Sequence, residues 1–446
     1  MSATREKPAD SLSILKGKIN SKSAVVGVLG LGYVGLPLAL VFEEAGFPVI
    51  GFDVDPAKPA ALLTGESYIR HLGAERVAAA FRRGRIRATT DFGRLSECDA
   101  LVICVPTPLG RHREPDLSFV RSTAETIAAH LRRGQLVVLE STTYPGTTRE
   151  ELLPRFEARG LRCGVDFFLA FSPEREDPGN ASFHTRNTPK VVGGVDAASR
   201  DAAVALYGAV VERVVPVSSA EVAESAKLLE NIFRSVNIAL VNELKVVFDR
   251  MGIDVWEVIE AAKTKPFGFM AFYPGPGLGG HCIPLDPFYL AWKAAEYGVW
   301  ARFIELAGEI NTSMPRYVVD KTIAALNARG KSVKGARILV LGLSYKADID
   351  DDRESPSYEL MDLLDEVGAD TAYCDPFIPL ARLGRRNRRE MRSAPCTQEE
   401  FARYDALVVA TAHTAFRDPL LYEDARLVID TRNLIAASGN FVLVKA

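Results

Sequence analysis

The chain has 446 residues, of which 48% are hydrophobic and 25% charged, and its formal net charge is −3. A chain of this length is too long for one hydrophobic core, so it predicts two or three domains of an ordinary globular protein. The near-neutral charge excludes binding to nucleic acid or a membrane surface through bulk charge, and six cysteines without regular spacing exclude a disulfide framework.

The N-terminal residues, MSATREKPADSLSILKGKI, form a polar leader that lacks the apolar centre of a signal peptide. No stretch of the sequence is long and apolar enough to span a membrane. The six histidines show neither HxxxH nor HExxH spacing, so we expect no metal site built by the protein. These features predict a cytoplasmic protein with no nucleic-acid partner and no membrane partner.

A strand–turn–helix–strand pattern follows the leader. The apolar residues 25–29 predict a buried strand, residues 36–45 a helix that ends at Gly46, and residues 49–52 a second strand. The turn between the first strand and the helix reads GLGYVG, which is a G-x-G-x-x-G motif. In that motif the glycines serve the tight turn, the approach of a pyrophosphate and the packing of helix on strand.

This motif predicts a binding site for a dinucleotide. The N-terminus of the following helix offers free N–H groups to phosphate. Asp53 ends the second strand, where a carboxylate holds the hydroxyls of the adenosine ribose and repels a 2′-phosphate, so NAD is favoured over NADP. The turn residues expected to contact NAD are Gly30, Gly32, Tyr33, Val34 and Gly35.

Three more buried strands are predicted at residues 99–105, 135–140 and 166–171, and a polar or turn-forming cluster follows each of them. Ligands bind at the carboxyl edge of an open α/β sheet. Thr107, Thr142 and Glu174 follow these strands and therefore point to one crevice. Each threonine can equally be a helix N-cap, and Glu174 a capping acid, so the topology leaves both interpretations open.

A long helix is predicted from Ser218, because no helix breaker occurs before Gly252. Ser218 and Glu221 have the spacing of a capping box. About thirty helical residues span roughly 45 Å, a length that suits a spine between two domains or the seam of a dimer. An apolar stripe at helical spacing comprises Val222, Leu229, Phe233, Val236, Leu240 and Leu244. Lys227 and Asn231 share one face, one turn apart, and their spacing alone also fits ordinary surface positions.

A helix predicted at residues 255–263 leads into the segment PGPGLGGHCIPLDP, residues 274–287, and helical patterns resume from residue 288 to about 328. The four glycines let the backbone approach a ligand closely, and the prolines deny the segment regular structure. Cys282 in this frame, with Asp286 four residues on, is a candidate nucleophile. The alternative is a surface turn in which the cysteine is a small buried hydrophobe.

From Lys334 the sequence returns to an α/β pattern, with a strand, a glycine turn and a polar loop that opens a helix at Ser355 and Pro356. The stretches YCDP and YDALVVATAHT repeat the earlier FDVDP and CDALVICVPTP. A full G-x-G-x-x-G is missing, so we expect a second, degenerate Rossmann-like domain that binds a nucleotide other than the dinucleotide. Arg432 follows the strand predicted at residues 427–430 and is a candidate contact.

We therefore predict an α/β fold with two Rossmann-like, doubly wound domains, joined by a helical domain with a long central helix. The expected boundaries are 1–217 for the NAD-binding domain, 218–328 for the helical domain and 329–446 for the second Rossmann-like domain.

Six motifs occur in a fixed order between about Val25 and Asn433: GLGYVGLPLA, VPTP, ESTTYPGTT, the helix with Lys227 and Asn231, GLGGHCIPLDP and LSYKADIDDDRESP. In this combination the chain resembles the UDP-glucose/GDP-mannose dehydrogenase family over nearly its whole length. The resemblance implies oxidation of the C6 hydroxyl of a nucleotide-linked sugar to a carboxylate, with two NAD and no metal. It also implies a homodimer formed through the helical domain and a UDP-sugar held by the third domain.

In the family the cysteine of the glycine-rich loop is the nucleophile, which is Cys282 in this sequence. The resemblance implies that its thiolate attacks an aldehyde formed at C6, giving a thiohemiacetal that is oxidised to a thioester and hydrolysed. Lys227 and Asn231 match positions that stabilise oxyanions at C6, and Asp286 with Lys227 handles the proton or water. The implied catalytic residues are Cys282, Lys227, Asn231, Asp286, Thr142 and Glu174, of which the last two position or activate water.

Further contacts are implied residue by residue. The cofactor is expected at Gly30, Gly32, Tyr33, Val34, Gly35, Asp53, Thr107, Thr142 and Arg353, the last of them across the cleft. The substrate is expected at Glu174, Arg175, Lys227, Asn231, Phe272, Tyr273, Leu278, Gly279, Gly280, Lys346 and Arg432, the last of them on the uridine side.

The sequence departs from the UDP-glucose members of the family in three places. Those members carry an arginine well before the cysteine, which reaches the sugar of a partner subunit, and KTKP at residues 263–266 contains none. Arg175 stands in SPER where an apolar residue is usual, and His281 precedes the cysteine. The segment TKPFGFMAFYPGPGLGGHCIPLDPFYL looks most like the branch that acts on UDP-N-acetylglucosamine, and we expect residues 265–273 to set the sugar selectivity.

The resemblance thus predicts an NAD-dependent UDP-N-acetylglucosamine 6-dehydrogenase of polysaccharide biosynthesis. UDP-N-acetylmannosamine, UDP-N-acetylgalactosamine and UDP-glucose are the alternative substrates. More distant alternatives are a two-electron β-hydroxyacid dehydrogenase, which needs neither the cysteine nor a third domain, and a sensing module without catalysis. The intact set of Lys227, Asn231, Cys282 and Asp286 argues against the sensing module.

Overall fold

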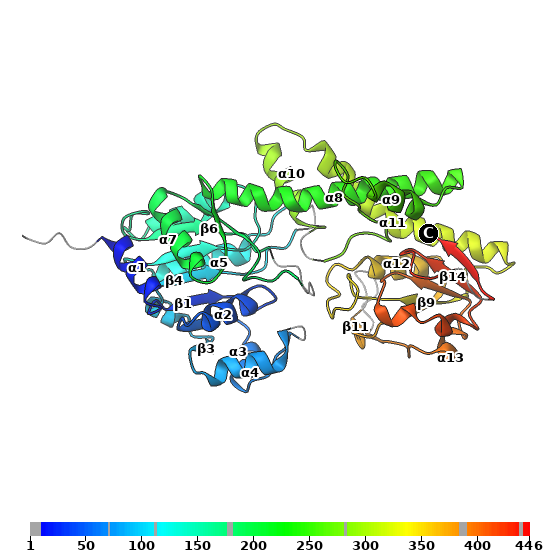
Figure 1. Cartoon of the computed structure of the whole chain (residues 1–446), viewed down its shortest axis with the longest axis horizontal. Helices are drawn as coiled ribbons and strands as arrows, with labels where there is room; N and C mark the ends of the chain where they lie inside the picture. The colour runs from blue at the N-terminus through cyan, green and yellow to red at the C-terminus, as the bar shows by residue number, and fades with distance from the viewer. Residues whose placement is uncertain are drawn as a thin grey trace, which may run out of the picture. The chain divides into compact units, whose positions relative to one another are not determined.

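The computed structural model describes residues 10–69, 72–110, 114–175, 182–280, 283–382, 390–436 and 440–446 (Figure 1). The chain forms two compact units. The N-terminal unit comprises Met1–Glu230 and Phe288–Val299, and the C-terminal unit comprises Asn231–Pro287 and Trp300–Ala446. The chain therefore passes from one unit to the other after residues 230, 287 and 299.

The N-terminal unit contains an eight-stranded sheet in the order β3-β2-β1-β4-β5-β6-β7-β8. Its strands are β1 (Val26–Leu29), β2 (Val49–Phe52), β3 (Ile86–Thr89), β4 (Ala100–Ile103), β5 (Leu136–Leu139), β6 (Phe168–Phe171), β7 (Lys190–Gly194) and β8 (Val214–Pro216). The first six strands are parallel, β7 runs antiparallel to β6, and β8 is parallel to β7. The central strands are continuous apolar runs because helices bury both faces of the sheet.

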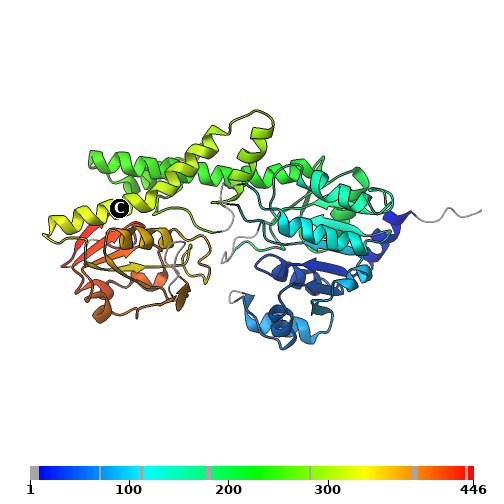
Figure 2. The same ribbon diagram turned by 180° about the vertical axis from the view of Figure 1, so that it is seen from behind.

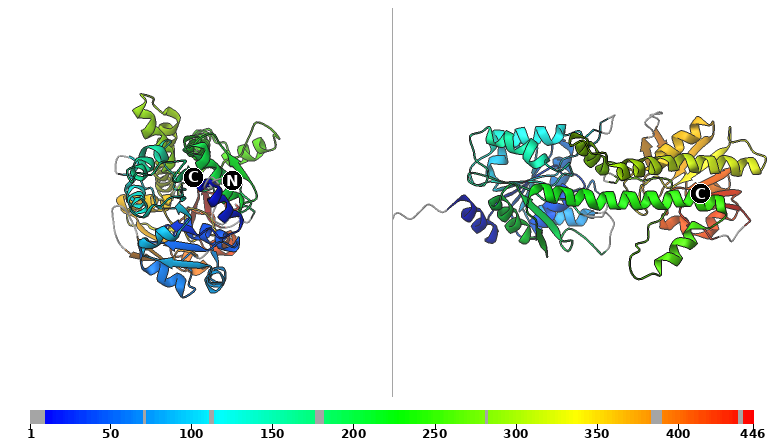
Figure 3. Two further views of the ribbon diagram at one scale, coloured as in Figure 1. Left: turned by 90° about the vertical axis from the view of Figure 1, so that its left-hand side faces the viewer. Right: turned by 90° about the horizontal axis from the view of Figure 1, so that it is seen from above.

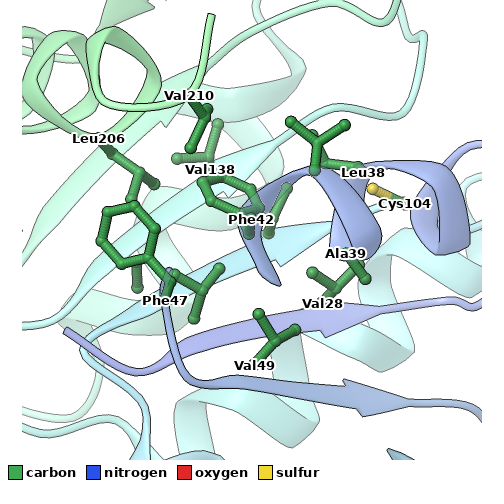
Figure 4. Close-up of a cluster of buried hydrophobic side chains, with 14 of the residues drawn as sticks. Val28, Leu38, Ala39, Phe42, Phe47, Val49, Cys104, Val138, Leu206 and Val210 are labelled. Carbon is green, nitrogen blue, oxygen red and sulfur yellow. The ribbon is translucent and has the colours of Figure 1, made fainter. Parts of the chain in front are cut away.

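Helices cover both faces of this sheet. They are α1 (Ser11–Asn20), α2 (Gly35–Glu44), α3 (Ala57–Leu63), α4 (Ala74–Arg82), α5 (Ser118–His130), α6 (Leu153–Glu157) and α7 (Ala197–Gly208), with the 3-10 turn η2 (Phe92–Glu97) and the π-helical turn η3 (Thr148–Leu152). Most of α10 (Asp286–Glu296) also belongs to this unit. One core cluster packs α2 and α7 on the sheet, where Phe42 and Leu206 lie near Val28 and Val138 (Figure 4). A second cluster on the opposite face includes residues of α5, seen in cyan in Figure 2, and of α6. These features confirm a doubly wound, Rossmann-like arrangement.

Residues 11–20 of the polar N-terminal segment form α1, a helix that was not predicted from the sequence. Asp10 caps this helix by accepting the N–H of Ser13 at 2.7 Å. Leu15 and Ile19 are one turn apart and both are buried in the core cluster that contains α2 and α7. A short apolar spacing inside a polar segment was therefore enough to dock a helix on the sheet.

Helix α8 (Ala220–Met251) has 32 residues, as the unbroken sequence pattern predicts, and is the long green helix in the right-hand view of Figure 3. The predicted capping box is wrong by one residue. Ser219 Oγ accepts the N–H of Val222 at 3.3 Å, so Glu221 lies in the second helical position rather than the third. Glu221 instead contacts Arg149, whose Nε lies 2.6 Å from its carboxylate.

Helix α8 differs from an ordinary surface helix, because several polar side chains are buried together with Ala223, Leu228, Ala239 and Val241, while large apolar side chains are exposed. Its buried polar face comprises Glu224, Lys227, Asn231, Ser235, Asn242 and Lys245. Its exposed apolar stripe comprises Val222, Leu229, Phe233, Leu240, Val247 and Met251. A helix that packs on one core normally buries its apolar face. The apolar stripe predicted from the sequence therefore exists, but four of its members point away from the core of this chain.

The C-terminal unit contains a parallel five-stranded sheet in the order β10-β9-β13-β14-β15 and a two-stranded antiparallel ribbon, β11-β12. The strands are β9 (Arg337–Leu341), β10 (Asp370–Cys374), β11 (Leu380–Arg382), β12 (Glu390–Arg392), β13 (Ala406–Val409), β14 (Leu427–Asp430) and β15 (Val442–Lys445). The helices are α9 (Val255–Lys263), α11 (Arg302–Ala328), α12 (Pro356–Glu366) and α13 (Gln398–Phe401), with the 3-10 turns η4 (Thr414–Arg417) and η5 (Pro419–Tyr422). The second Rossmann-like sheet expected from the sequence is confirmed.

Two local expectations for this region have different outcomes. Helix α12 begins where predicted, because Ser355 accepts the N–H of Ser357 and Pro356 takes the first helical position. The helical stretch expected from residue 288 to about 328 is two helices, α10 and α11. Gly298, with a φ of 71°, lies in the break between them, since this conformation ends a helix.

Candidate active site

The glycine turn between β1 and α2 fits a bound dinucleotide. A Cβ atom on Gly35 would lie 1.8 Å from the carbonyl oxygen of Gly30, so only glycine permits this packing of the helix on the turn. A Cβ atom on Gly32 would meet nothing within 4 Å. The space beside Gly32 is therefore open for the close approach that a pyrophosphate requires. Tyr33 and Val34 are half-buried in the same turn.

Asp53 is held in place by the turn itself. Its Oδ2 atom accepts the N–H of Leu31 at 2.9 Å, and its Oδ1 atom accepts the N–H of Asp55 at 3.0 Å. The ammonium of Lys58 on α3 lies 2.9 Å from Oδ2. The carboxylate is thus fixed at the end of β2, where an adenosine ribose is expected.

Thr107, Thr142 and Glu174 follow β4, β5 and β6, whose carboxyl ends are neighbours at one edge of the parallel sheet. Neither threonine caps a helix, because the N-cap residue of α5 is Leu117 and that of η3 is Thr147. The capping interpretation of the threonines is therefore wrong, and their expected ligand contacts stay predictions.

Glu174 and Arg175 both have contacts within the N-terminal unit. One oxygen of Glu174 accepts the N–H of Arg175 at 2.6 Å, and the other lies 3.7 Å from Nζ of Lys190. The guanidinium of Arg175 lies 2.7 Å from the carboxylate of Glu230 and donates to the carbonyl of Pro189 at 2.6 Å. Both side chains that are expected to contact the sugar therefore already form hydrogen bonds or ion pairs with residues of their own unit.

The buried polar face of α8 carries the pair predicted at helical spacing. Lys227 and Asn231 are 8% and 7% exposed, so neither is an ordinary surface residue. Nδ2 of Asn231 donates to Oδ2 of Asp286, the first residue of α10, at 2.6 Å. The structure therefore joins two of the predicted catalytic residues from distant segments. Cys282 and His281 lie outside the described residues.

The described part of the glycine-rich loop packs within the C-terminal unit. The N–H of Gly275 donates to Oδ1 of Asn242 on α8 at 3.0 Å. A Cβ atom on Gly275 would lie 2.3 Å from Nη1 of Arg432, so the loop backbone lies directly against this guanidinium. Leu278, further along the loop, is half-buried.

The second half of the loop packs against the polar segment before α12. A Cβ atom on Gly279 would lie 2.6 Å from Cβ of Tyr345. The N–H of Gly280, whose φ is 84°, donates to the carbonyl of Arg353 at 3.0 Å. Lys346 follows Tyr345 and is half-buried. The loop thus meets the segment that holds two more predicted ligand contacts.

The two arginines predicted to contact ligands in this unit, Arg432 and Arg353, are oriented by neighbouring groups of the chain. Nε of Arg432 donates to the carbonyl of Ala410 at 2.8 Å. Burial lowers the pKa of Arg432 to about 10, which leaves its guanidinium charged near neutral pH. The guanidinium of Arg353 forms a bidentate pair with Asp351, with a shortest distance of 2.6 Å.

Phe272 and Tyr273 pack on α8 and α9. The ring of Phe272 meets that of Phe233 edge-on at 5.7 Å between centroids. The ring of Tyr273 stacks on Trp256 at 5.8 Å, and its hydroxyl donates to Glu260 at 2.6 Å. These contacts give both residues a packing role, and their expected contact with substrate stays a prediction.

The C-terminal unit has its own counterpart of Asp53. Asp375 follows β10, and its Oδ2 atom accepts the N–H groups of Leu343 and Ser344 at 2.6 and 2.8 Å. Oδ1 accepts two further main-chain N–H groups, and Nε2 of His413 lies 3.1 Å from Oδ2. Burial alone would raise the pKa of Asp375, but His413 and these donors outweigh it and hold it at about 2. Asp375 thus fixes the turn after β9 from within the unit, through donors of its own chain.

Sequence reasoning missed three buried polar residues: Asn242 in the C-terminal unit, and Glu224 and Lys190 in the N-terminal unit. Asn242 lies roughly three turns of α8 beyond Asn231, so the helical spacing that links Lys227 to Asn231 could have found it. Lys190 lies at the start of an apolar strand and shows no such pattern.

Among the described residues, no cluster of three or more His, Cys, Asp or Glu side chains is arranged to hold a metal ion. In the part of the chain that the structure describes, no helix has the length and apolar character needed to cross a membrane.

Two Rossmann-like sheets, one of them with an open glycine turn, define the chain as an α/β protein of the dinucleotide-binding class. Three sequence models of one family match the chain in order. They are the NAD binding domain at residues 24–211, the central domain at 221–313 and the UDP binding domain at 339–437 of the UDP-glucose/GDP-mannose dehydrogenase family. The chain belongs to this family and is an NAD-binding oxidoreductase, which confirms the resemblance carried by its motifs.

Individual relatives agree with this membership. The chain is 35% identical over 399 residues to a UDP-N-acetyl-D-glucosamine 6-dehydrogenase of Pseudomonas aeruginosa, covering 89% of this chain and 92% of that protein. It is 36% identical to an NDP-N-acetyl-D-galactosaminuronic acid dehydrogenase of Ralstonia nicotianae, covering 92% and 96%. The structure of a UDP-D-ManNAc dehydrogenase from Pyrococcus horikoshii matches with a TM-score of 0.86 and 32% identity, covering 94% and 98%.

Proposed function

We propose that this protein oxidises the C6 hydroxyl of UDP-N-acetylglucosamine to a carboxylate with two equivalents of NAD. The contact between Asn231 and Asp286 carries the proposal, because it sets a carboxylate beside the amide on the buried polar face that also holds Lys227. Relatives of 35% and 34% identity that are named UDP-N-acetyl-D-glucosamine 6-dehydrogenases support this choice of sugar.

Each proposed catalytic residue has a defined task. NAD, when bound at the glycine turn, accepts the hydride in each of the two oxidations. Lys227 and Asn231 donate hydrogen bonds to the oxyanion that develops at C6. The Cys282 thiolate bonds to C6 of the aldehyde to give a thiohemiacetal, and loss of a second hydride turns this adduct into a thioester.

Hydrolysis completes the cycle. Water adds to the thioester carbon, the bond from C6 to sulfur breaks, and the acid and the free thiol are released. In the proposal Thr142 and Glu174 position or activate this water, and Asp286 accepts the proton. Thr107 and Arg353 contact NAD, while Lys346 and Arg432 contact the UDP-sugar.

We further propose the domain boundaries 1–217, 218–328 and 329–446, and a homodimer. The exposed apolar stripe of α8 supports the dimer, because a large apolar patch exposed along one helix face is typical of a protein–protein interface.

A panel of UDP-sugars tests the function. UDP-N-acetylglucosamine should give two NADH per sugar and the highest kcat/KM. One NADH per sugar would contradict the covalent route, and no NADH with any sugar would contradict the function. UDP-N-acetylmannosamine is the second candidate, since the UDP-D-ManNAc dehydrogenase of Pyrococcus horikoshii has a similar structure, with a TM-score of 0.86. The kcat/KM values from the same panel decide between the two sugars.

Substitution of Cys282→Ser tests the thioester route. Turnover should stop at or before the acid, because serine is a far weaker nucleophile than a thiolate. Full turnover to the acid with two NADH in this variant would rule out a cysteine thioester.

A further inference from the structure

A buried array of charges lies behind Glu174. Lys190 is the first residue of β7, and its Nζ lies 2.8 Å from Oε2 of Glu140 and 3.7 Å from Oε2 of Glu174. The side chains of Lys190 and Glu140 are 4% and 0% exposed, against 14% for Glu174. The hydroxyl of Tyr207 donates to the other oxygen of Glu140, and its ring lies 5.2 Å from Nζ of Lys190. Of these groups the proposed mechanism uses only Glu174.

The antiparallel pairing of β6 and β7 explains why Lys190 meets Glu174. Phe171, the last residue of β6, pairs with Gly193. Glu174 is three residues beyond Phe171, and Lys190 is three residues before Gly193. Partners in an antiparallel ladder move in opposite directions along the two chains. The register therefore places Lys190 opposite Glu174, just past the carboxyl edge of β6.

The array contains two carboxylates and one ammonium. Burial raises the pKa of Glu140, although Lys190 counteracts the effect. Burial works to lower the pKa of Lys190, but Glu140 and Glu174 outweigh it and leave that pKa raised. Lys190 is therefore the cation between two acids. Without it the partly exposed Glu174 would lose this ion pair and turn toward solvent, because water solvates a carboxylate better than a site without a cation does.

We propose that Lys190 is a positioning residue for hydrolysis of the thioester. It holds one oxygen of Glu174 in place at the edge of β6, so that the carboxylate stays aimed at the attacking water. This inference rests on the proposed function, in which Glu174 positions or activates that water. Lys190 acts through Glu174 and touches neither substrate nor NAD.

The test compares Lys190→Met/Glu140→Gln with Glu140→Gln alone. The double variant removes the cation together with its buried partner charge, so no unpaired carboxylate is left in the core. Glu140→Gln should keep kcat within about twofold of the wild type, because the contact of Lys190 with Glu174 remains. The double variant should lose roughly 10- to 100-fold in kcat at unchanged KM, the usual effect of a misplaced catalytic group.

Rapid mixing identifies the step that is slowed. Both oxidations precede hydrolysis, so the double variant should still release two NADH per active site in a fast first phase. Intact-protein mass spectrometry of the quenched enzyme should show the sugar nucleotide attached to the chain. A folding defect would instead lower the amplitude of this first NADH phase by the same factor as kcat, because misfolded enzyme contributes to neither. Lys190→Arg, which keeps a cation, should recover most of the lost rate.

Two outcomes would overturn the proposal while the function stands. One is a double variant that turns over as fast as Glu140→Gln. The other is loss of the NADH phase itself, which would place the role of Lys190 before hydrolysis. If the wild type forms no NADH with any UDP-sugar, the proposed function is wrong and the proposal falls with it, so the wild-type control separates the two failures.

Discussion

Gly275 is the residue at which the backbone of the glycine-rich loop packs against the guanidinium of Arg432. Its backbone is fixed on one side by Asn242, and the guanidinium of Arg432 occupies the other side. That guanidinium is itself bonded to the carbonyl of Ala410. A side chain at Gly275 would therefore have to displace a group that the chain holds in place.

Gly275→Ala should weaken binding of the UDP-sugar. The added methyl would lie 2.3 Å from Nη1 of Arg432, so the arginine must move and lose its carbonyl partner. We expect KM for the sugar nucleotide to rise at least ~10-fold and the free energy of unfolding to fall by about 1–3 kcal/mol. Steady-state kinetics and urea unfolding measure the two effects. Gly17→Ala is the control, because its methyl would meet nothing within 4 Å on α1.

Glu224 should make the stability of the protein depend on pH. It is fully buried and accepts the N–H groups of Gly146 and Thr148 at 2.6 and 2.9 Å. Burial raises its pKa from 4.5 to about 7 despite these donors. Between these values the folded chain holds a proton that the unfolded chain has lost, so this contribution is complete below pH 4.5 and is lost as pH rises through 7.

Glu224→Gln should remove this dependence. Relative to the variant, the wild type should lose up to ~3 kcal/mol of unfolding free energy as the pH rises through that window. Urea unfolding of both proteins at a series of pH values gives the difference directly. Parallel curves for the two proteins would contradict the raised pKa.

Site residues that follow from the spacing of neighbouring residues in the sequence could be predicted. Contacts between residues that are far apart in the sequence could not. The glycine turn, Asp53 and the pair of Lys227 and Asn231 follow from the periods of strands and helices. The contact of Asn231 with Asp286 joins segments whose approach depends on the packing of whole elements. The same holds for Lys190, which nothing in its own strand marks as a partner of Glu174.

Among the elements, α8 shows what a periodic pattern can and cannot specify. The apolar stripe and the length of the helix were predictable, since both are properties of consecutive residues. Which face is buried was not predictable, because the buried face mixes polar and apolar residues and finds its partners in other segments. The parallel strands β1, β2, β4, β5 and β6 were predicted to within a few residues. The strands β3, β7 and β8 were missed: β3 alternates in burial, β7 begins with a lysine and ends with two glycines, and β8 has only three residues.

Asn242 is the part of α8 that ties the helix to the glycine-rich loop. Its amide oxygen accepts the N–H of Gly275, and its Nδ2 donates to Asn311 at 2.9 Å. Asn242→Ala would leave both groups buried without a partner, which costs about 1–3 kcal/mol each. We expect lower stability and a higher KM for the UDP-sugar. Asn237→Ala on the same helix is the matched control, because Asn237 bonds only within its own turn.

For the whole molecule, the exposed stripe of α8 predicts how copies assemble. Leu229→Asp/Leu240→Asp places charges on two side chains that are 67% and 51% exposed in a single chain. If the stripe forms a two-fold interface, each substitution acts twice, and dimer affinity should fall by at least ~10³-fold. Analytical ultracentrifugation should then show a monomer. Val165→Asp, at a residue that is 51% exposed away from α8, should leave the dimer intact.

The three passages of the chain between its units decide which fragments can fold alone. A protein whose chain crosses once can be divided by a single cleavage, but here residues 288–299 return to the N-terminal unit. The hydroxyl of Tyr289 donates to the carbonyl of Thr107, and Trp292 packs on Tyr144 at 5.2 Å. A fragment that ends at residue 230 would lack both contacts and expose the loops that carry Thr107 and Thr142. The NAD-binding half is therefore separable only as two peptides, or as one in which α10 is joined back by a new linker.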